Sequence, residues 1–267
     1  MFDEPDPMSA LWPIAPSSTT DWLRELCDDD GLTGFMPPPM PDAAWVLNAM
    51  YEHGRGPAEV THHEHHRALL AAGSIEPHTV PGLDLEAVSV VTGSGVGRAE
   101  HPGRGWRRLR WAELARRTGD PVVPEGVYPG FRCFPSAQKD SSWPLRILPP
   151  AEGSLDRETW NRLVHVLTDH SPAGPDTRCL AYYNPLTLGA VEFENLHVRS
   201  GLLRDAEALY DTTDTDFSPA NLWAEDHSWV LCTDYDLWAT KVAGPPALIE
   251  ALLTDPELEV LRLPWAA

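Results

Sequence analysis

Residues 229–242 read WVLCTDYDLWATKV, and apolar residues alternate with small or polar ones along much of this stretch. In a β-strand, successive side chains point to opposite faces of the sheet. A strand over 228–242 would place Asp234 and Asp236 on one face, roughly 6.6 Å apart by strand rise, with Trp238 beside them. We therefore predict a sheet strand here, with one face that carries both carboxylates.

Helical spacing and strand-like runs predict the other elements of the fold. Predicted helices cover 18–27, 41–50, 61–73, 105–119, 155–170 with Ser154 as the cap, and a last helix that opens at 245–246. Predicted strands cover 85–91, 178–183, 190–198, 228–242 and 258–263. Helices come early and strands cluster late, which favours an α+β fold over a regular βαβ alternation. We expect a mixed or antiparallel sheet in the C-terminal half, packed by helices, and a helical N-terminal part.

The distribution of these elements predicts three segments. Residues 1–17 are rich in Pro, Asp and Ser and are expected to form a loose leader. Residues 18–102 are expected to form a helical N-terminal subdomain, and residues 103–267 an α+β domain.

Composition narrows the class of partner. The chain has 267 residues with 40 Asp and Glu against 20 Lys and Arg, a net charge of −20. Nucleic-acid binding needs a positive face for phosphate contacts, so it is excluded, and an anionic membrane surface would repel this chain. A basic protein, in contrast, would be steered toward it. We expect a protein partner, possibly basic.

The start and the cysteines predict the compartment. The first residues, MFDEPDPMSALWPI, lack the charged and then apolar pattern of a signal peptide, and no stretch approaches the ~18 apolar residues of a membrane span. The four cysteines, Cys27, Cys133, Cys179 and Cys232, are scattered without a CxxC spacing. We expect a reduced, cytoplasmic protein.

The histidine run HHEHH is the sequence feature closest to a metal motif. On a helix, His62 and His66 lie at i and i+4, the spacing by which zinc proteins present two imidazoles. The metalloprotease order HExxH is absent, however, and Thr61 with Glu64 forms a capping box that commits Glu64 to the helix backbone. We predict no metal site and rank a His62–His66 site below that.

Two further patterns bear on cofactors and anions. Gly93, Gly95 and Gly97 follow a predicted strand, but a break at His101 replaces the helix that a dinucleotide loop requires, so we expect no cofactor. Six arginines also fall between positions 104 and 117. They are expected to pair with local carboxylates, with an anion or partner site as the open alternative.

The C-terminal half resembles a family of uncharacterised proteins from high-GC bacteria. The matching stretches are WAELARRTG at 111–119, PPAEGSLD at 149–156, LVHVLTDHS at 163–171, and NLWAEDHSWVLCTDYDLWATKVAG with LIEALLTDPELE within 221–259. The resemblance implies one domain over roughly 100–267 and no known activity. This chain has Ala224, His227 and Ala243-Gly244-Pro245 where the family usually shows proline, arginine and Gly-Gly-Ser.

Two functions compete on these residues. We expect a non-enzymatic binding protein of the immunity or accessory type, with an acidic, tryptophan-rich recognition face, because large rigid rings contribute most at interfaces. The residues expected on that face are Trp223, Asp226, His227, Asp234, Asp236 and Trp238. The alternative is a hydrolase or divalent-metal-dependent enzyme that uses Asp234 and Asp236, with no catalytic residue assigned beyond these candidates.

Overall fold

A computed structural model describes residues 10–57, 59–76, 79–80, 83–84, 89–188 and 197–263. The chain divides into two compact units, which we call the large unit and the small unit. The large unit comprises Met1–Asn48, Val96–Glu100 and Ala151–Ala267, and the small unit comprises Ala49–Gly95 and His101–Pro150. Each unit is described by itself below.

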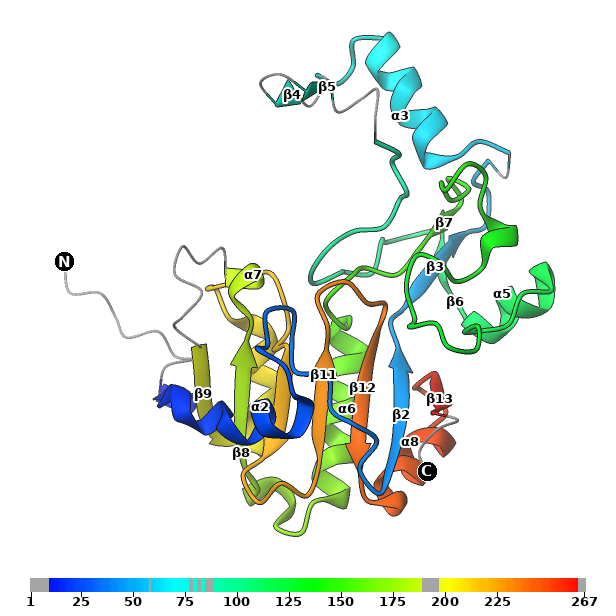
Figure 1. The fold of residues 1–267 in the computed structure, drawn as a ribbon. Coiled ribbons are helices and arrows are strands. Elements are labelled where there is room, and N and C mark those ends of the chain that lie inside the picture. The colour runs from blue at the N-terminus through cyan, green and yellow to red at the C-terminus, as the bar shows by residue number, and fades with distance from the viewer. Residues whose placement is uncertain are drawn as a thin grey trace. The chain divides into compact units, whose positions relative to one another are not determined.

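The large unit is built on an antiparallel sheet of eight strands in the order β1-β9-β8-β10-β11-β12-β2-β13 (Figure 1). The strand bounds are β1 Ile14–Ala15, β2 Asp42–Leu47, β8 Arg178–Tyr183, β9 His197–Leu202, β10 Asn221–Ala224, β11 Val230–Thr233, β12 Ala239–Gly244 and β13 Val260–Arg262. The strand predicted over 178–183 is confirmed as β8, and the one over 258–263 as the shorter β13. Of the strand predicted over 190–198, residues 190–196 lie outside the described part, and β9 begins at His197.

Strand β2 corrects the helix that was predicted over 41–50. All six residues of β2 are buried, and the strand pairs with β12 on one side and β13 on the other. Trp45 and Val46 therefore face opposite layers, and both are almost fully buried. A strand covered on both faces is an unbroken apolar run, and over six residues such a run is easily mistaken for part of a helix.

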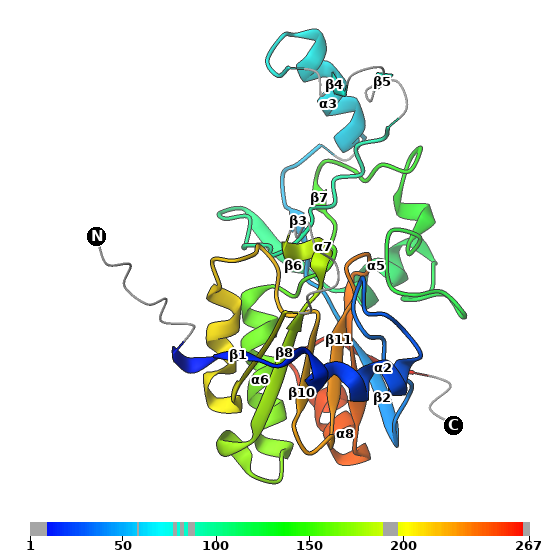
Figure 2. The same cartoon turned by 60° about the vertical axis from the view of Figure 1, so that its left-hand side comes forward.

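One face of the sheet packs against helices. These are α6 (Arg157–His170), α8 (Pro246–Thr254) and the 3-10 segment η4 (Leu203–Asp211) (Figures 1 and 2). Helix α6 confirms the predicted helix, but its cap is Asp156 rather than Ser154, because the Asp156 carboxylate accepts from the Thr159 amide at 3.1 Å. The core on this face contains Leu231 and Val242 of the sheet and Trp160 of α6.

The other face of the sheet is covered by η1 (Ser17–Thr20), α2 (Asp21–Cys27) and the loop that follows (Figure 2). Asn221 in the middle of the sheet holds this loop: its Oδ1 accepts from the Phe35 amide and its Nδ2 donates to the Phe35 carbonyl, both at 2.8 Å. The Tyr182 hydroxyl donates to the Gly31 carbonyl at 2.8 Å. The predicted helix over 18–27 is thus confirmed, and buried polar side chains fix the segment after it.

The stretch from 228 to 242 is a hairpin rather than one strand. β11 ends at Thr233, a turn follows, and β12 begins at Ala239. Asp234 ends the strand because its Oδ1 accepts from the Asp236 amide at 3.0 Å and its carbonyl accepts from the Leu237 amide at 3.2 Å. A short side chain that bonds the backbone two residues on competes with a ladder, which is why aspartate favours turns.

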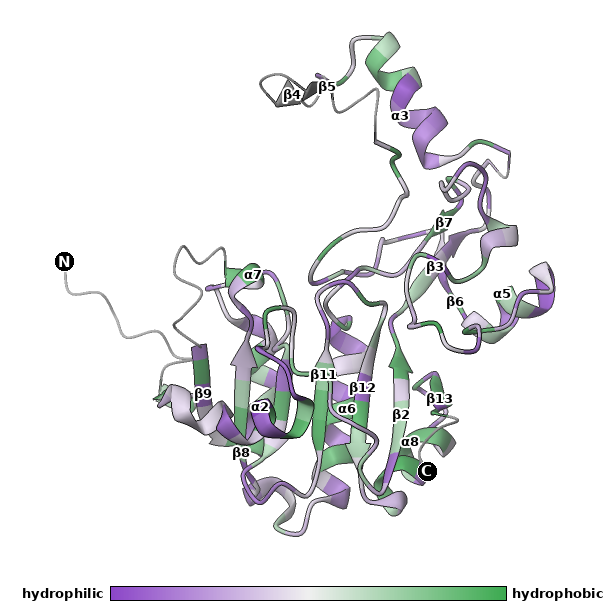
Figure 3. Cartoon of the chain, in the orientation of Figure 1, coloured by the Kyte–Doolittle hydropathy of each residue, from purple (hydrophilic) through white to green (hydrophobic). Residues whose placement is uncertain are grey.

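The small unit holds a three-stranded antiparallel sheet and short helices. Its elements are β3 (Met50–His53), β6 (Trp106–Leu109) and β7 (Ile147–Leu148) in the order β6-β3-β7, the β4–β5 pair (Thr79–Val80 and Leu83–Asp84), α3 (His62–Ala71), α5 (Trp111–Thr118) and η2 (Pro135–Ala137). The capping box of α3 is present as predicted. None of the side chains of α3 is buried, and Figure 3 shows its first turns as hydrophilic.

The helix predicted over 105–119 is correct only in its second half. Residues 106–109 form β6, which pairs with β3, and the helix α5 begins at Trp111. Of the strand predicted over 85–91, residues 85–88 lie outside the described part and 89–91 form no strand.

Taken by class, the fold is mixed α+β, as predicted. Two short elements complete the large unit, η3 (Gly174–Asp176) and α7 (Pro185–Leu188). No helix in the described part of the chain has the length and apolar character needed to cross a bilayer.

Candidate functional site

The predicted site residues lie at opposite ends of β11. Asp226 and His227 belong to the turn between β10 and β11, whereas Asp234 and Asp236 belong to the turn between β11 and β12. In an antiparallel meander, consecutive turns lie at opposite ends of the shared strand. The structure therefore does not bring the four polar residues together.

The two tryptophans of the predicted face are buried. Trp223 and Trp238 each have no exposed surface, because β10 lies in the middle of the sheet and Trp238 directly precedes β12. Neither ring is available on an exposed face. What remains of the predicted recognition surface is its carboxylates.

The turn between β11 and β12 forms the centre of an acidic surface. We call Asp29, Glu152, Asp234 and Asp236 the acidic cluster. Asp234 is half-buried, and its Oδ2 accepts from the Thr33 hydroxyl at 2.7 Å, which joins the turn to the loop after α2. Burial raises the pKa of Asp234, and repulsion from Asp236 and Asp29 adds to that rise. The carboxylates are thus close enough to disfavour one another's ionised form.

Glu152 shows the same electrostatic stress. Burial raises the pKa of its carboxyl, repulsion from Asp236 raises it further, and a hydrogen bond from the Trp238 indole acts in the opposite direction. Among the described residues, no lysine or arginine forms an ion pair with any member of the acidic cluster. The cluster is therefore an uncompensated concentration of negative charge.

The opposite end of β11 is organised differently. His227 has a left-handed backbone with φ of 60°, and its ring stacks on Trp22 of α2 with 4.0 Å between ring centroids. Asp226 Oδ1 accepts from the Ser228 amide at 3.0 Å, and Glu225 pairs with Arg178 at 2.8 Å. These side chains hold the turn together, so their interactions are accounted for within the fold.

The histidines of α3 also have local partners. His62 Nε2 lies 2.9 Å from the Ile147 carbonyl, so this nitrogen donates a proton there. His63 Nδ1 accepts from the Val91 amide at 3.3 Å. Within the described ranges, no group of three His, Cys, Asp or Glu side chains is placed to hold a metal ion.

The arginine cluster of the small unit pairs with local carboxylates, as expected for two of its members. Arg107 and Arg117 both contact Glu52, whose side chain is 11% exposed, and both contact Glu113. Burial of Glu52 opposes its ionisation, but the two arginines more than offset this and lower its pKa. This network ties α5 to strand β3.

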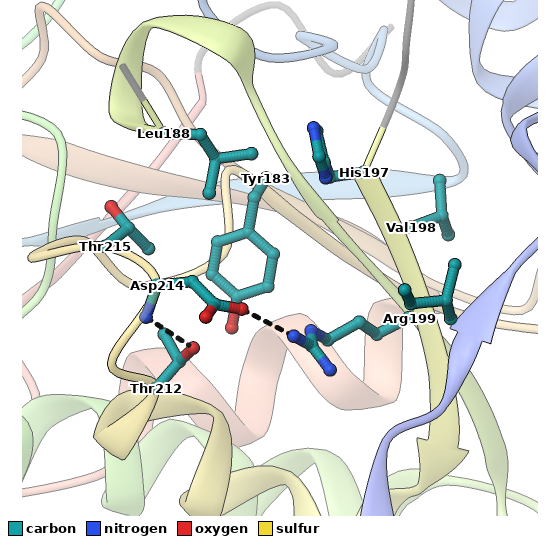
Figure 4. A pocket seen from close by; sticks show the side chains of 9 residues that line it. Tyr183, Leu188, His197, Val198, Arg199, Thr212, Asp214 and Thr215 are labelled. Carbon is teal, nitrogen blue, oxygen red and sulfur yellow. Dashed lines mark hydrogen bonds and ion pairs between the residues drawn. The ribbon is translucent and has the colours of Figure 1, made fainter. Parts of the chain in front are cut away.

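Sequence patterns did not indicate the cavity that lies beside β8 and β9. Its volume is about 390 Å³, within the range of small-molecule sites. Its walls are formed by Ile14, Tyr183, Leu188, His197, Val198, Arg199, Thr212, Asp214 and Thr215, most of which are labelled in Figure 4. These residues come from four separate segments without a recognisable motif, so only the fold could assemble them.

An ion pair and a buried phenol organise the polar side of this cavity. Arg199 Nη2 lies 2.5 Å from Asp214, and its Nη1 donates to the Trp12 carbonyl at 3.0 Å (Figure 4). The Tyr183 hydroxyl donates to the Leu209 carbonyl at 3.1 Å, and burial raises the pKa of this phenol. Because Arg199 and Asp214 neutralise each other, the cavity suits an uncharged, partly apolar molecule.

Comparison with known proteins adds no relative: no family model matches the chain, and neither the curated proteins nor the solved structures contain a match.

Proposed function

We propose that this protein is a non-enzymatic binding protein that captures a basic protein partner through the acidic cluster. The observation that carries the proposal is the pair of raised carboxyl pKa values at Asp234 and Glu152, each of which includes repulsion from Asp236. Repulsion that a fold retains among its own groups is relieved when a cation arrives. Perturbed groups of this kind gather at functional sites.

The net charge of −20 acts in the same direction. A negative molecule attracts a positive one over a distance and raises the rate of encounter. The acidic cluster would then select where the partner docks, because carboxylates from three segments of the chain meet there. Lysine and arginine side chains of a partner can reach such a dispersed set individually.

A metal ion fits these carboxylates less well than a protein does. Both oxygens of Asp234 already accept hydrogen bonds, one from the Asp236 amide and one from the Thr33 hydroxyl. A divalent cation needs several oxygens that converge on one point. The hydrolase alternative has one observation in its favour, the raised pKa of Asp234, which is the property of a general acid or base.

The test compares two triple variants with equal net charge. The first replaces Asp29, Asp234 and Asp236 with asparagine. The control replaces the exposed acids Glu158, Asp169 and Glu207, which lie on α6 and η4 over the other face of the sheet. Binding to a lysine-rich peptide is measured at two salt concentrations, with circular dichroism to show that each variant is folded.

The proposal expects the first variant to lose affinity about tenfold or more beyond the control, with a weaker dependence on salt. Equal losses in both variants would show that only total charge matters, and would overturn the assignment of the acidic cluster. The hydrolase alternative is favoured instead if peptide binding is unchanged in the first variant.

A further inference from the structure

Lys241 is one of only two lysines in a chain that has eighteen arginines. Within the described part of the chain, it is the one basic residue that is buried, with 5% of its surface exposed. Its counterpart Lys139 has a side chain that is 61% exposed and pairs with Glu64. The two lysines therefore sit in opposite environments. Unlike arginine, a buried lysine can lose its proton and become a nucleophile.

The sheet places Lys241 among thiols. Cys232 of β11 and Trp45 of β2 are its direct neighbours across the strands, so the three side chains share one face. That face is the one beneath α2, whose last residue is the half-buried Cys27. Both Cys27 and Cys232 lie close enough to interact electrostatically with Lys241.

None of these neighbours carries a charge that would hold Lys241 in its protonated form. Burial raises the pKa of Cys27 to about 12 and places that of Cys232 well above the ordinary thiol value, so both thiols are neutral at pH 7. The Trp45 ring lies 5.9 Å from the ammonium nitrogen, at the outer limit of a cation–π contact. No described carboxylate forms an ion pair with Lys241, and burial lowers its pKa.

We propose that Lys241 is a nucleophilic amine that binds a small aldehyde covalently in the layer between α2 and the sheet. The Nζ lone pair attacks the carbonyl carbon, and a proton moves from nitrogen to the carbonyl oxygen to give a carbinolamine. Loss of water, with breakage of the C–O bond and release of the second amine proton, gives an imine. The reaction consumes one amine and one aldehyde and forms one water, with no oxidant or reductant.

Packing around the cluster limits the aldehyde to a small one. A methyl group built onto Gly34 would lie 3.1 Å from the Cys232 sulfur, so the covering loop is in close contact with the sheet here. The half-buried side chain of Cys27 marks the point where the cluster meets the surface. This inference goes beyond the acidic cluster and does not depend on it.

The experiment uses the reactivity of the two lysines in one folded chain. The protein is exposed at pH 7 to formaldehyde, and in a parallel sample to glycolaldehyde, with cyanoborohydride to trap the imine. Peptide mass spectrometry then gives the rate of modification at Lys241 and at Lys139. Each unit by which a lysine pKa falls increases its neutral fraction at pH 7 about tenfold, so we expect Lys241 to be modified at least about tenfold faster.

Equal rates, or faster reaction at Lys139, would overturn the proposal. Because burial could slow the reaction by limiting access, the rate at Lys241 is also measured against pH. A midpoint below that of Lys139 supports a neutral amine whatever the absolute rate, and a midpoint at the ordinary lysine value overturns it. The Lys139→Arg variant should leave the modification of Lys241 unchanged, and Lys241→Met should abolish it.

Discussion

Thr33 Oγ1 donates to Asp234 Oδ2 over 2.7 Å, and this contact joins two segments that lie 201 residues apart in the sequence. It fixes the loop after α2 against the turn between β11 and β12. The same contact favours the ionised form of a carboxylate that burial and its acidic neighbours disfavour. One hydroxyl therefore contributes both to the fold and to the charge of the acidic cluster.

Removing this hydroxyl should change both properties. We expect Thr33→Val to lower the free energy of unfolding by about 1 kcal/mol, the usual net value of a hydrogen bond, and to raise the pKa of Asp234 further. Urea denaturation gives the first quantity and an NMR titration of the carboxyl gives the second. Thr254→Val, which removes an exposed hydroxyl bonded to its own helix, is the control. An unchanged Asp234 titration would refute the role of Thr33.

Two buried tryptophans allow a matched comparison. The Trp229 indole donates to the Ser171 hydroxyl at 2.8 Å, whereas the Trp223 indole nitrogen has no hydrogen-bond partner among the described residues. We expect Trp229→Phe to lower the free energy of unfolding by about 1 kcal/mol more than Trp223→Phe, because only the former loses a hydrogen bond. Equilibrium unfolding in urea measures both, and the reverse order would contradict the structure.

Glu52 should stabilise the small unit in a pH-dependent way. Its pKa is lowered in the folded protein, so its contribution is present above the unfolded value of about 4.3 and is lost as pH falls through the lower folded value. At pH 7 we expect Glu52→Gln to cost about 1–2 kcal/mol, since its arginine partners are partly exposed.

Unfolding of the Glu52→Gln variant should also vary less with pH at acid values than unfolding of the wild type. Glu125→Gln, at an exposed position, is the control and should leave the pH profile unchanged. A Glu52→Gln variant whose profile follows the wild type at every pH would exclude the ion-pair network as the source.

Lys241 predicts a stability change of the opposite sign. Its folded pKa is lowered, so the cost of burying the ammonium is present in full below that value and fades as pH rises toward the unfolded value of about 10.4. Lys241→Met should therefore be more stable than the wild type at pH 7, and the difference should shrink with rising pH.

Lys139→Met is the matched control for Lys241→Met. Ion pairing raises the pKa of Lys139, so its stabilising contribution is present below the unfolded value and is lost as pH rises through the folded one. The two variants should thus differ in sign at pH 7 when unfolding is measured in urea. The same sign in both would contradict the contrast between the two lysines.

Local signals predicted several elements well. The Thr61–Glu64 capping box and the apolar spacing of 155–170 are contained within a few residues, and both helices are present. The run RCLAYY at 178–183 is β8 with the predicted bounds. Such patterns succeed because the interactions that cause them are between near neighbours along the chain.

Other features depend on residues that are far apart in the sequence. Strand β2 is decided by β12 and β13, about two hundred positions away, which supply its ladder and cover its apolar residues. The end of β11 depends on Asp234, which the alternating pattern placed inside a strand. Alternation shows which side chains share a face, but it does not show where the backbone leaves the sheet.

The sequence by itself determined the negative charge, the mixed α+β class and the helices that carry their own caps, because these follow from composition and from near neighbours. Only the tertiary structure decided that Trp223 and Trp238 are buried, that Asp234 meets Thr33, and that Lys241 is enclosed with two thiols. Burial depends on which distant segments cover a side chain, and that coverage is what raises or lowers its pKa.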